Sequence, residues 1–323
     1  LRPRSRRAGQ GPWTQLADEG RRLQLLNLLG QQEDVLRRVL ELRQQMRTLP
    51  DPPGPDDWSI PVWNVREGLL DTGRAAALRL EAWQQALALN AEISKSEQQR
   101  GASALKQAGT RFNDYGPLLR LGRVAEAGDL LLFCRDVFEQ ANAIYELGKV
   151  LSALADVEDE LDQPGAAVRF EEAALRFSYV GTEIADIGIR HHNLANYLGR
   201  TGGDPRVVLA HRLAAALIFL ATGSGTKRQS LAALARNLRD GGQPARAALP
   251  ADFAALCATV QEVEGVRFAE LMARLLANQE ISGDELLRLV ITKVLEHIDT
   301  GAADAAEPPA GPPSDVQEGQ ATP

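Results

Sequence analysis

The chain has 323 residues and a formal net charge of −7 at pH 7, which argues against the concentrated basic face that nucleic-acid binding requires. Apolar residues make up 44% of the sequence but aromatic residues only 5%, and the apolar share is mostly Leu and Ala, which favours helix over strand. No apolar run approaches the length of a membrane span, so we expect neither nucleic acid nor a membrane as partner.

The N-terminal region divides into three segments by composition. Residues 1–12 are rich in Arg, Gly and Pro and are expected to form a disordered basic arm. Residues 13–49 show the apolar spacing of a helical hairpin that breaks near Gly30. Residues 50–57 contain too many prolines for a helix to cross and are expected to form a loop.

Residues 58–250 have the pattern of successive helical hairpins. The first of these is expected over residues 58–92, with its turn at Asp71-Thr72-Gly73. The next is expected over residues 100–140, with its turn at Leu121-Gly122-Arg123.

A Leu-Ala phrase then returns every 40 residues, at Leu154-Ala155, Leu194-Ala195 and Leu234-Ala235. Each copy is followed by a turn that contains Gly and Pro, and Asp204 before Pro205 is expected to cap a helix. A fixed period of this size is typical of a stacked repeat, whose extended surface usually binds another macromolecule.

The period fades after Pro250, and residues 251–299 are expected to form C-terminal capping helices. The last of these helices begins with Ser282 and Glu285, which have the spacing of a capping box. Residues 300–323 are expected to form a disordered acidic tail rich in Pro and Ala.

Residues 154–175, LADVEDELDQPGAAVRFEEAAL, resemble a tetratricopeptide repeat (TPR). The signature positions that match are Leu154, Ala155, Leu161, Ala167, Ala174 and Leu175. The period of about 40 residues is longer than the 34 residues of the family. The resemblance implies an all-α fold, a right-handed α-solenoid of stacked antiparallel helical hairpins.

The resemblance also implies that a partner binds the concave face, which the first helix of each hairpin lines. Asn amides suit peptide backbone and Arg suits carboxylates, although the same residues are also compatible with the solvated face of an amphipathic helix. The candidate contact residues are Lys149, Ser152, Asp156, Asp159, Glu160, His192, Asn193, Asn196, Arg200, Gln229, Arg236 and Asp240.

The acidic stretch around Asp156 argues against the carboxylate clamp of the family, because that clamp uses Asn where Asp156 stands. An acidic surface beside one that is rich in Asn, His and Arg suits a basic or mixed-charge peptide. We therefore expect a partner of that kind.

Nothing in the sequence indicates catalysis or a cofactor. Gly223 to Lys227 has the wrong residue order for a phosphate loop, and no nucleophile elbow is present. His191, His192 and His211 lack metal-site spacing, and we expect His191 to be packed and His192 exposed. We expect no metal, no cofactor and no enzyme activity.

The sequence thus predicts a non-catalytic scaffold that binds a protein or peptide. An alternative is a regulatory or sensor segment of a larger protease, nuclease or signalling enzyme whose catalytic domain lies outside this chain. Cys134 and Cys257 lie far apart among apolar neighbours, which fits free thiols in a reducing compartment and hence a cytoplasmic location.

Overall fold

The computed structural model describes residues 11–49, 61–181 and 184–299. Within these ranges the regular structure consists of α-helices, and no strand is present. The all-α prediction is therefore confirmed. The Pro-rich loop, the acidic tail and all but the last two residues of the predicted basic arm lie outside the described residues, and Pro12 already begins the first helix.

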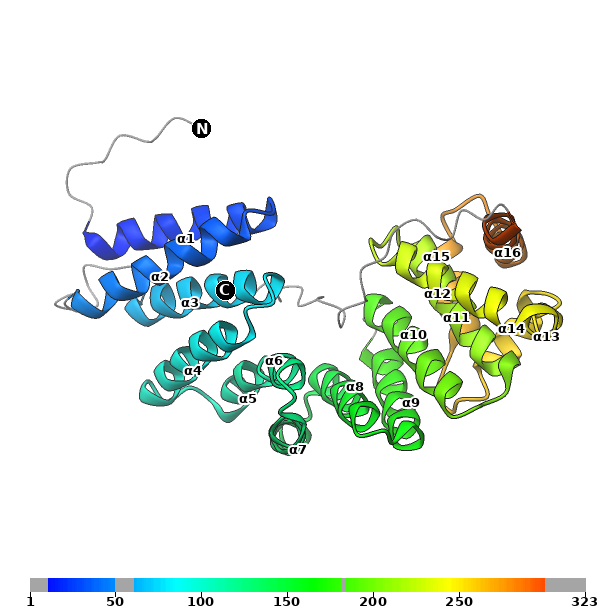
Figure 1. The fold of residues 1–323 in the computed structure, drawn as a ribbon, viewed down its shortest axis with the longest axis horizontal. Helices are drawn as coiled ribbons and strands as arrows, with labels where there is room; N and C mark the ends of the chain where they lie inside the picture. Colours follow the sequence, from blue (N-terminus) through cyan, green and yellow to red (C-terminus); the bar gives the residue numbers. More distant parts are fainter. Residues whose placement is uncertain (1–10, 50–60, 182–183, 300–323) are drawn as a thin grey trace. The chain divides into compact units, whose positions relative to one another are not determined.

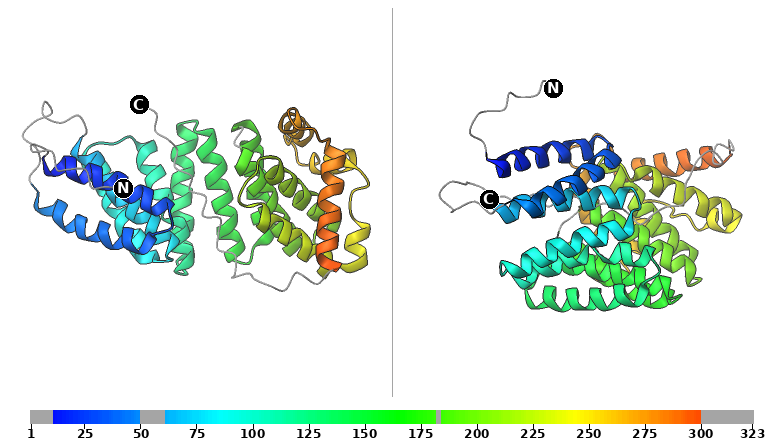
Figure 2. Two further views of the ribbon diagram at one scale, coloured as in Figure 1. Left: turned by 90° about the horizontal axis from the view of Figure 1, so that it is seen from above. Right: turned by 60° about the vertical axis from the view of Figure 1, so that its left-hand side comes forward.

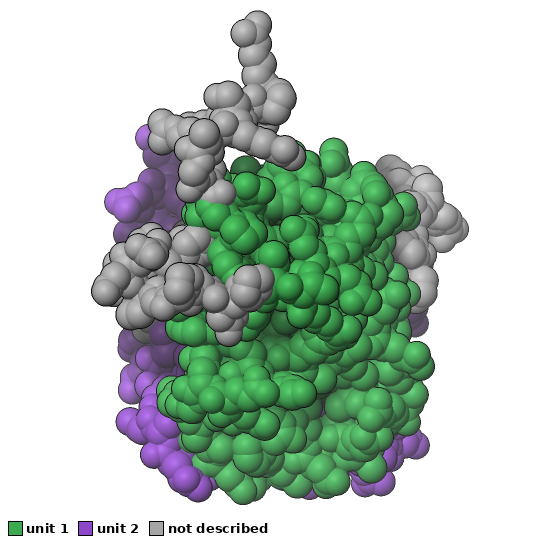
Figure 3. Space-filling view, turned by 90° about the vertical axis from the view of Figure 1, so that its left-hand side faces the viewer, with its two compact units in different colours: residues 1–137, 311–323 green, residues 138–310 purple. Residues whose placement is uncertain are grey.

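The chain divides into two compact units, which are coloured separately in Figure 3. Described residues up to Val137 belong to unit 1, and those from Phe138 onward belong to unit 2. The boundary falls within the segment 58–250, which the sequence presents as a single run of repeats. The handedness of the stack stays a prediction.

Unit 1 is built by helices that pack mainly on near neighbours in the chain: α3 contacts α1, α2 and α4, and α4 contacts α5 and α6 (Figure 1). Gly30, with φ of 84°, ends the first hairpin arm as the sequence predicts. The helices are α1 (Pro12–Leu28), α2 (Gln32–Thr48), α3 (Val62–Arg79), α4 (Trp83–Gln99), α5 (Ala104–Phe112), α6 (Tyr115–Arg120) and most of α7 (Val124–Gln140).

The turn expected at Asp71-Thr72-Gly73 is wrong, because α3 runs through these residues and ends at Arg79. The turn lies instead at Glu81, which has a φ of 56°. A Cβ atom on Gly73 would lie 2.5 Å from Cγ1 of Val39 on α2. The glycine therefore permits a close crossing of two helices and does not end one.

Unit 2 begins with two hairpins whose second helices start at proline (Figures 1 and 2). Asp204 caps α11 as predicted, since its Oδ1 accepts from the backbone N–H of Arg206 at 2.8 Å. The hairpins are α8 (Ile144–Glu160) with α9 (Pro164–Gly181), and α10 (Ile184–Arg200) with α11 (Pro205–Ala221).

The Leu-Ala phrase lies where the helices of unit 2 pack. All six of its residues are at most 5% exposed. Ala167, Ala174 and Leu175 are fully buried as well, whereas Leu161 at the end of α8 is 52% exposed and does not pack as its signature position implies. The repeated sequence is therefore a packing surface.

Helix α11 is the centre of the remaining bundle, with 12 buried residues along its length. It contacts each of the five helices that follow it as well as α10. The capping box is confirmed, because Ser282 N–H donates to Glu285 Oε2 at 2.8 Å and Glu285 N–H donates to Ser282 Oγ at 3.2 Å. These later helices are α12 (Lys227–Asp240), α13 (Gly242–Ala247), α14 (Phe253–Val260), α15 (Phe268–Leu276) and α16 (Gly283–Asp299).

Candidate functional site

The polar side chains of α10 make contacts on two sides within unit 2. On one side they meet α8, at Asp156 and Asp159, and we call this the α8–α10 seam. On the other side they meet a side chain of α11 that also reaches α12. The first helices α8, α10 and α12 therefore contribute to one polar face, which is the candidate functional site.

Direct bonds between α8 and α10 hold the α8–α10 seam together. The hydroxyl of Tyr197 donates to Asp156 Oδ1 at 2.6 Å. Arg200 forms ion pairs with Asp159 at 2.5 Å and with Asp162 at 2.9 Å. Three of the predicted contact residues, Asp156, Asp159 and Arg200, therefore also join neighbouring hairpins.

A buried carboxyl group lies beneath this seam. Glu171 of α9 is fully buried, and neither of its oxygens has a hydrogen-bond partner of good geometry among the described residues. Burial raises the pKa of Glu171 to about 7, while the charge of Arg190 and the nearby Ser152 and Asn193 oppose that shift. The seam thus holds a carboxyl group that is partly protonated at neutral pH.

Two further predicted residues of α8 have shifted pKa values. Burial raises the pKa of Asp156 to about 6, against the hydrogen bond from Tyr197. Burial lowers the pKa of Lys149, against the opposing charge of Asp186, and the Lys149 amine lies 5.1 Å from the centroid of the Tyr145 ring. Burial is therefore the main influence on both ionisable groups.

The other side of α10 is organised around Arg212 of α11. Its Nε donates to Asn237 Oδ1 of α12 and its Nη2 donates to Asn196 Oδ1 of α10, both at 2.6 Å. His192 lies in the same region. Burial is the main cause that lowers the pKa of its imidazole to about 4, and the positive charges of Arg212 and Arg236 contribute to the same shift. A side chain from a second helix thus joins two first helices.

The histidine expectations are correct for one residue and wrong for the other. His191 is fully buried as predicted, and its Nδ1 lies 2.9 Å from Nδ1 of His211. The hydroxyl of Tyr179 lies 3.0 Å from Nε2 of His191. His192 is half-buried and not exposed, because it turns toward the region of Arg212.

The four remaining candidates, Glu160, Gln229, Arg236 and Asp240, are exposed. Arg236 lies close enough to influence Arg212 and His192 electrostatically. Asp240 Oδ1 lies 3.7 Å from Nε of Arg239, its neighbour in the chain. The structure therefore brings together the candidates of α8 and α10 better than those of α12.

The chain resembles BtubC. This solved structure, BtubC (BKLC) from P. vanneervenii, is 11% identical over 86% of this chain and 95% of BtubC, with a TM-score of 0.51. At that identity the likeness shows only the fold, an all-helical repeat-like stack. No protein-family model matches the sequence, and no curated protein matches it either.

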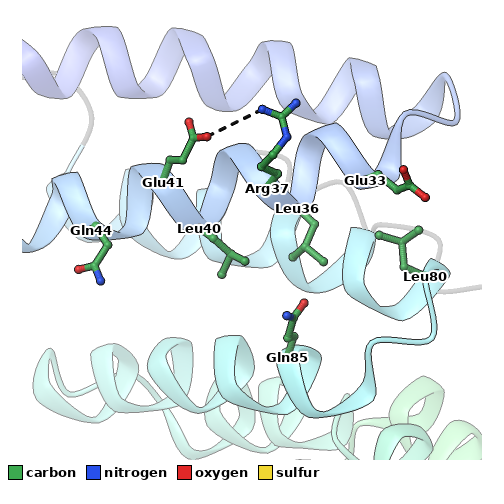
Figure 4. A pocket seen from close by; sticks show the side chains of 8 residues that line it. All are labelled: Glu33, Leu36, Arg37, Leu40, Glu41, Gln44, Leu80 and Gln85. Atoms are coloured by element: carbon green, nitrogen blue, oxygen red, sulfur yellow. Dashed lines mark ion pairs between the residues drawn. The ribbon is translucent and has the colours of Figure 1, made fainter.

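Unit 1 contains an open pocket of about 620 Å³ between α2, the end of α3 and α4 (Figure 4). Leu36 and Leu40 of α2 point toward Gln85 of α4 in this view. None of the predicted contact residues lines the pocket, which is formed by Glu33, Leu36, Arg37, Leu40, Glu41, Gln44, Leu80 and Gln85.

Four polar residues of this region are not among those predicted from the sequence: Glu171, Arg190, Arg212 and Asn237. The sequence contains a signal for two of them. Arg212 stands within the largely apolar stretch from Val207 to Leu220 of α11, and Glu171 stands among the Ala and Leu positions of the repeat signature. An ionisable residue at a packing position must be paired, neutralised or bound to a ligand.

None of the helices within the described ranges combines the length and the hydropathy that a membrane span requires.

Proposed function

We propose that this chain is a non-catalytic scaffold with TPR-like repeats that binds a protein or peptide on the polar face of α8, α10 and α12. The observation that supports the proposal is a set of buried polar atoms that have no hydrogen-bond partner among the described residues. At this face they are Arg190 Nε, His192 Nδ1 and Arg212 Nη1. Buried polar atoms usually have partners, so a bound peptide with its own donors and acceptors would complete the face.

The TPR-like character is supported by the repeat geometry. Helix α8 begins at Ile144 and helix α10 begins 40 residues later, at Ile184. The buried Leu-Ala phrase has the same spacing of 40 residues. The period exceeds that of the family by about six residues. The partner surface of α8 and α10 corresponds to the surface that the resemblance implies.

The charges of the face favour a mixed-charge peptide. The α8–α10 seam contains the carboxyl groups of Asp156 and Asp159, which suit a basic side chain. The region around Arg212 is positive. The net charge of −7 is in keeping with a partner that is neither nucleic acid nor membrane, and the buried free thiols of Cys134 and Cys257 suit a cytoplasmic location.

A peptide-display screen on the purified full chain tests the proposal. We expect selected peptides to lose at least about tenfold in affinity for a Lys149→Ala, Asn193→Ala double variant, because both side chains lie at the α8–α10 seam. Asn278→Ala, an exposed substitution away from this face in the same unit, should bind as the wild type does.

The proposal fails if the screen selects no peptide, or if every selected peptide binds the double variant as tightly as the wild type. Circular dichroism of each variant verifies that the helices are intact.

A further inference from the structure

Three arginine side chains are buried among the described residues: Arg74, Arg190 and Arg212. Arg74 forms an ion pair with Asp71. Arg190 lies close enough to Glu171 and Asp156 to lower the pKa of each carboxyl group. Arg212 is only 7% exposed and forms no ion pair with any described residue. It is therefore a buried charge that no carboxylate of the described residues compensates.

Neutral groups hold Arg212 in a fixed orientation. The amide oxygens of Asn237 and Asn196 accept from Nε and Nη2, which leaves Nη1 buried with no acceptor. A guanidinium has its donors in a rigid planar fork, so two fixed bonds also fix the direction of the third nitrogen. The direction of Nη1, which has no acceptor among the described residues, is therefore fixed.

The surroundings of Arg212 increase its need for an anion. Burial, together with the positive charge of Arg236, lowers the pKa of Arg212 to about 10. The group nevertheless remains charged at neutral pH. His192 beside it is neutral at that pH and has a buried Nδ1 without a partner. A buried charge that lacks an opposite charge is strongly unfavourable, and an anionic ligand would remove that cost.

We propose that Arg212, which already bonds Asn196 of α10 and Asn237 of α12, is the anchor for a carboxylate side chain of the bound peptide. This inference rests on the proposed peptide-binding function and deepens it. Arginine suits this task because its planar fork matches a carboxylate. The mixed-charge partner would then place an acidic residue at Arg212 and a basic residue at the α8–α10 seam.

Isothermal titration calorimetry on the full chain tests the anchor with three probes. These are a blocked tetrapeptide of four glutamates, a blocked tetrapeptide of four glutamines, and inorganic phosphate. We expect binding of the glutamate peptide only. Arg212→Met should weaken it by at least about tenfold, because truncation of a buried charge partner is costly.

The matched control is Arg206→Met on the same helix. Arg206 is exposed and lies 3.6 Å from Asp204, and its loss should change affinity by less than about twofold. If circular dichroism shows that Arg212→Met is unfolded, Arg212→Lys replaces it. Lysine retains the charge but not the fork, so several-fold weaker binding is expected.

Three outcomes overturn the anchor: no binding of the glutamate peptide to the wild type, equal binding to the Arg212 variant, or binding of phosphate alone. If peptides from the display screen bind the Arg212 variant normally but lose affinity for the Lys149 and Asn193 variant, the anchor fails and the proposed function survives. If the screen yields no peptide, the proposed function fails regardless of Arg212.

Discussion

Glu171 shows how one buried side chain makes stability depend on pH. Its folded pKa of about 7 lies above the ordinary value of 4.5. The folded state therefore holds a proton that the unfolded chain releases between these two values. The stabilising effect of the neutral carboxyl group is complete below pH 4.5 and is lost as the pH rises through 7. This loss lowers the free energy of unfolding by about 3 kcal/mol at most.

We predict that Glu171→Gln raises the free energy of unfolding at pH 8 relative to wild type, by about 1–3 kcal/mol, and changes it much less at pH 5. Glutamine keeps the shape of the protonated carboxyl group and cannot ionise. Urea denaturation at both pH values measures the difference. Glu172→Gln, the half-buried neighbour that pairs with Arg176 at 3.7 Å, is the control and should show little pH dependence. An equal effect of Glu171→Gln at both pH values would contradict the prediction.

The buried histidines act in the opposite direction. Burial lowers the pKa of His211 to about 4, below the ordinary 6.5. Its contribution to stability is present above pH 6.5 and is lost as the pH falls through 4, because the unfolded state then binds the proton that the folded state excludes. The free energy of unfolding of the wild type therefore varies with pH through opposing contributions. Only the difference between Glu171→Gln and the wild type isolates the contribution of Glu171.

At the scale of the helix, α3 contains two glycines in different surroundings. Gly73 meets Val39 of α2, where an added Cβ would lie 2.5 Å from Cγ1, whereas no atom lies within 4 Å of a Cβ added at Gly68. Both residues stand in the same helix and have the same unfavourable helix propensity. Substitutions at Gly68 and Gly73 therefore separate the effect of helix propensity on stability from the effect of side-chain packing.

We predict that Gly68→Ala stabilises the protein by about 0.5–1 kcal/mol, through helix propensity alone. Gly73→Ala should instead destabilise it by about 1–3 kcal/mol, because the new methyl group forces α2 and α3 apart. Thermal unfolding of the two variants measures the contrast. If Gly73→Ala is as stable as Gly68→Ala, the close crossing of α2 and α3 is not rigid.

The same glycine marks the limit of prediction from the sequence. Local signals placed the turns at Gly30 and Gly122, the Asp204 cap and the Ser282 capping box, since each of these depends on residues close together in the chain. The role of Gly73 depends on Val39, 34 residues away, and a single sequence does not show that contact.

The candidate site divides in the same way. Helical periodicity predicts that Asp156, Asn196 and Arg200 lie on the polar sides of their helices, because one turn of a helix determines which residues share a side. In the structure each of them bonds a side chain of another helix. Periodicity does not show that Arg212 reaches between α10 and α12, because that geometry depends on three helices that pack together.

At the scale of the whole molecule, buried residues form separate hydrophobic clusters in the two units. One extends from Trp13 to Ile93 in unit 1, and another from Leu175 to Val294 in unit 2. In stacked repeats, each element is stabilised mainly by its neighbours. A cavity in one cluster should therefore destabilise the helices of its own unit and leave those of the other unit stable.

We predict that Leu213→Ala, at a fully buried position of α11, lowers hydrogen-exchange protection in α10–α16 and leaves α1–α4 protected. The cavity should cost about 2–5 kcal/mol in its own unit. Leu69→Ala in α3, 1% exposed, is the reciprocal variant and should produce the reverse pattern. Uniform loss of protection across the chain in either variant would show that both clusters unfold together.

The burial of α11 has a consequence for synthesis. This helix leaves the ribosome before α14, α15 and α16, which cover it in the finished protein. Until about 80 further residues have been translated, the apolar surface from Val208 to Phe219 lacks its native cover. The nascent chain is then most exposed to aggregation and to chaperone capture, and a truncation soon after Ala221 would make that exposure permanent.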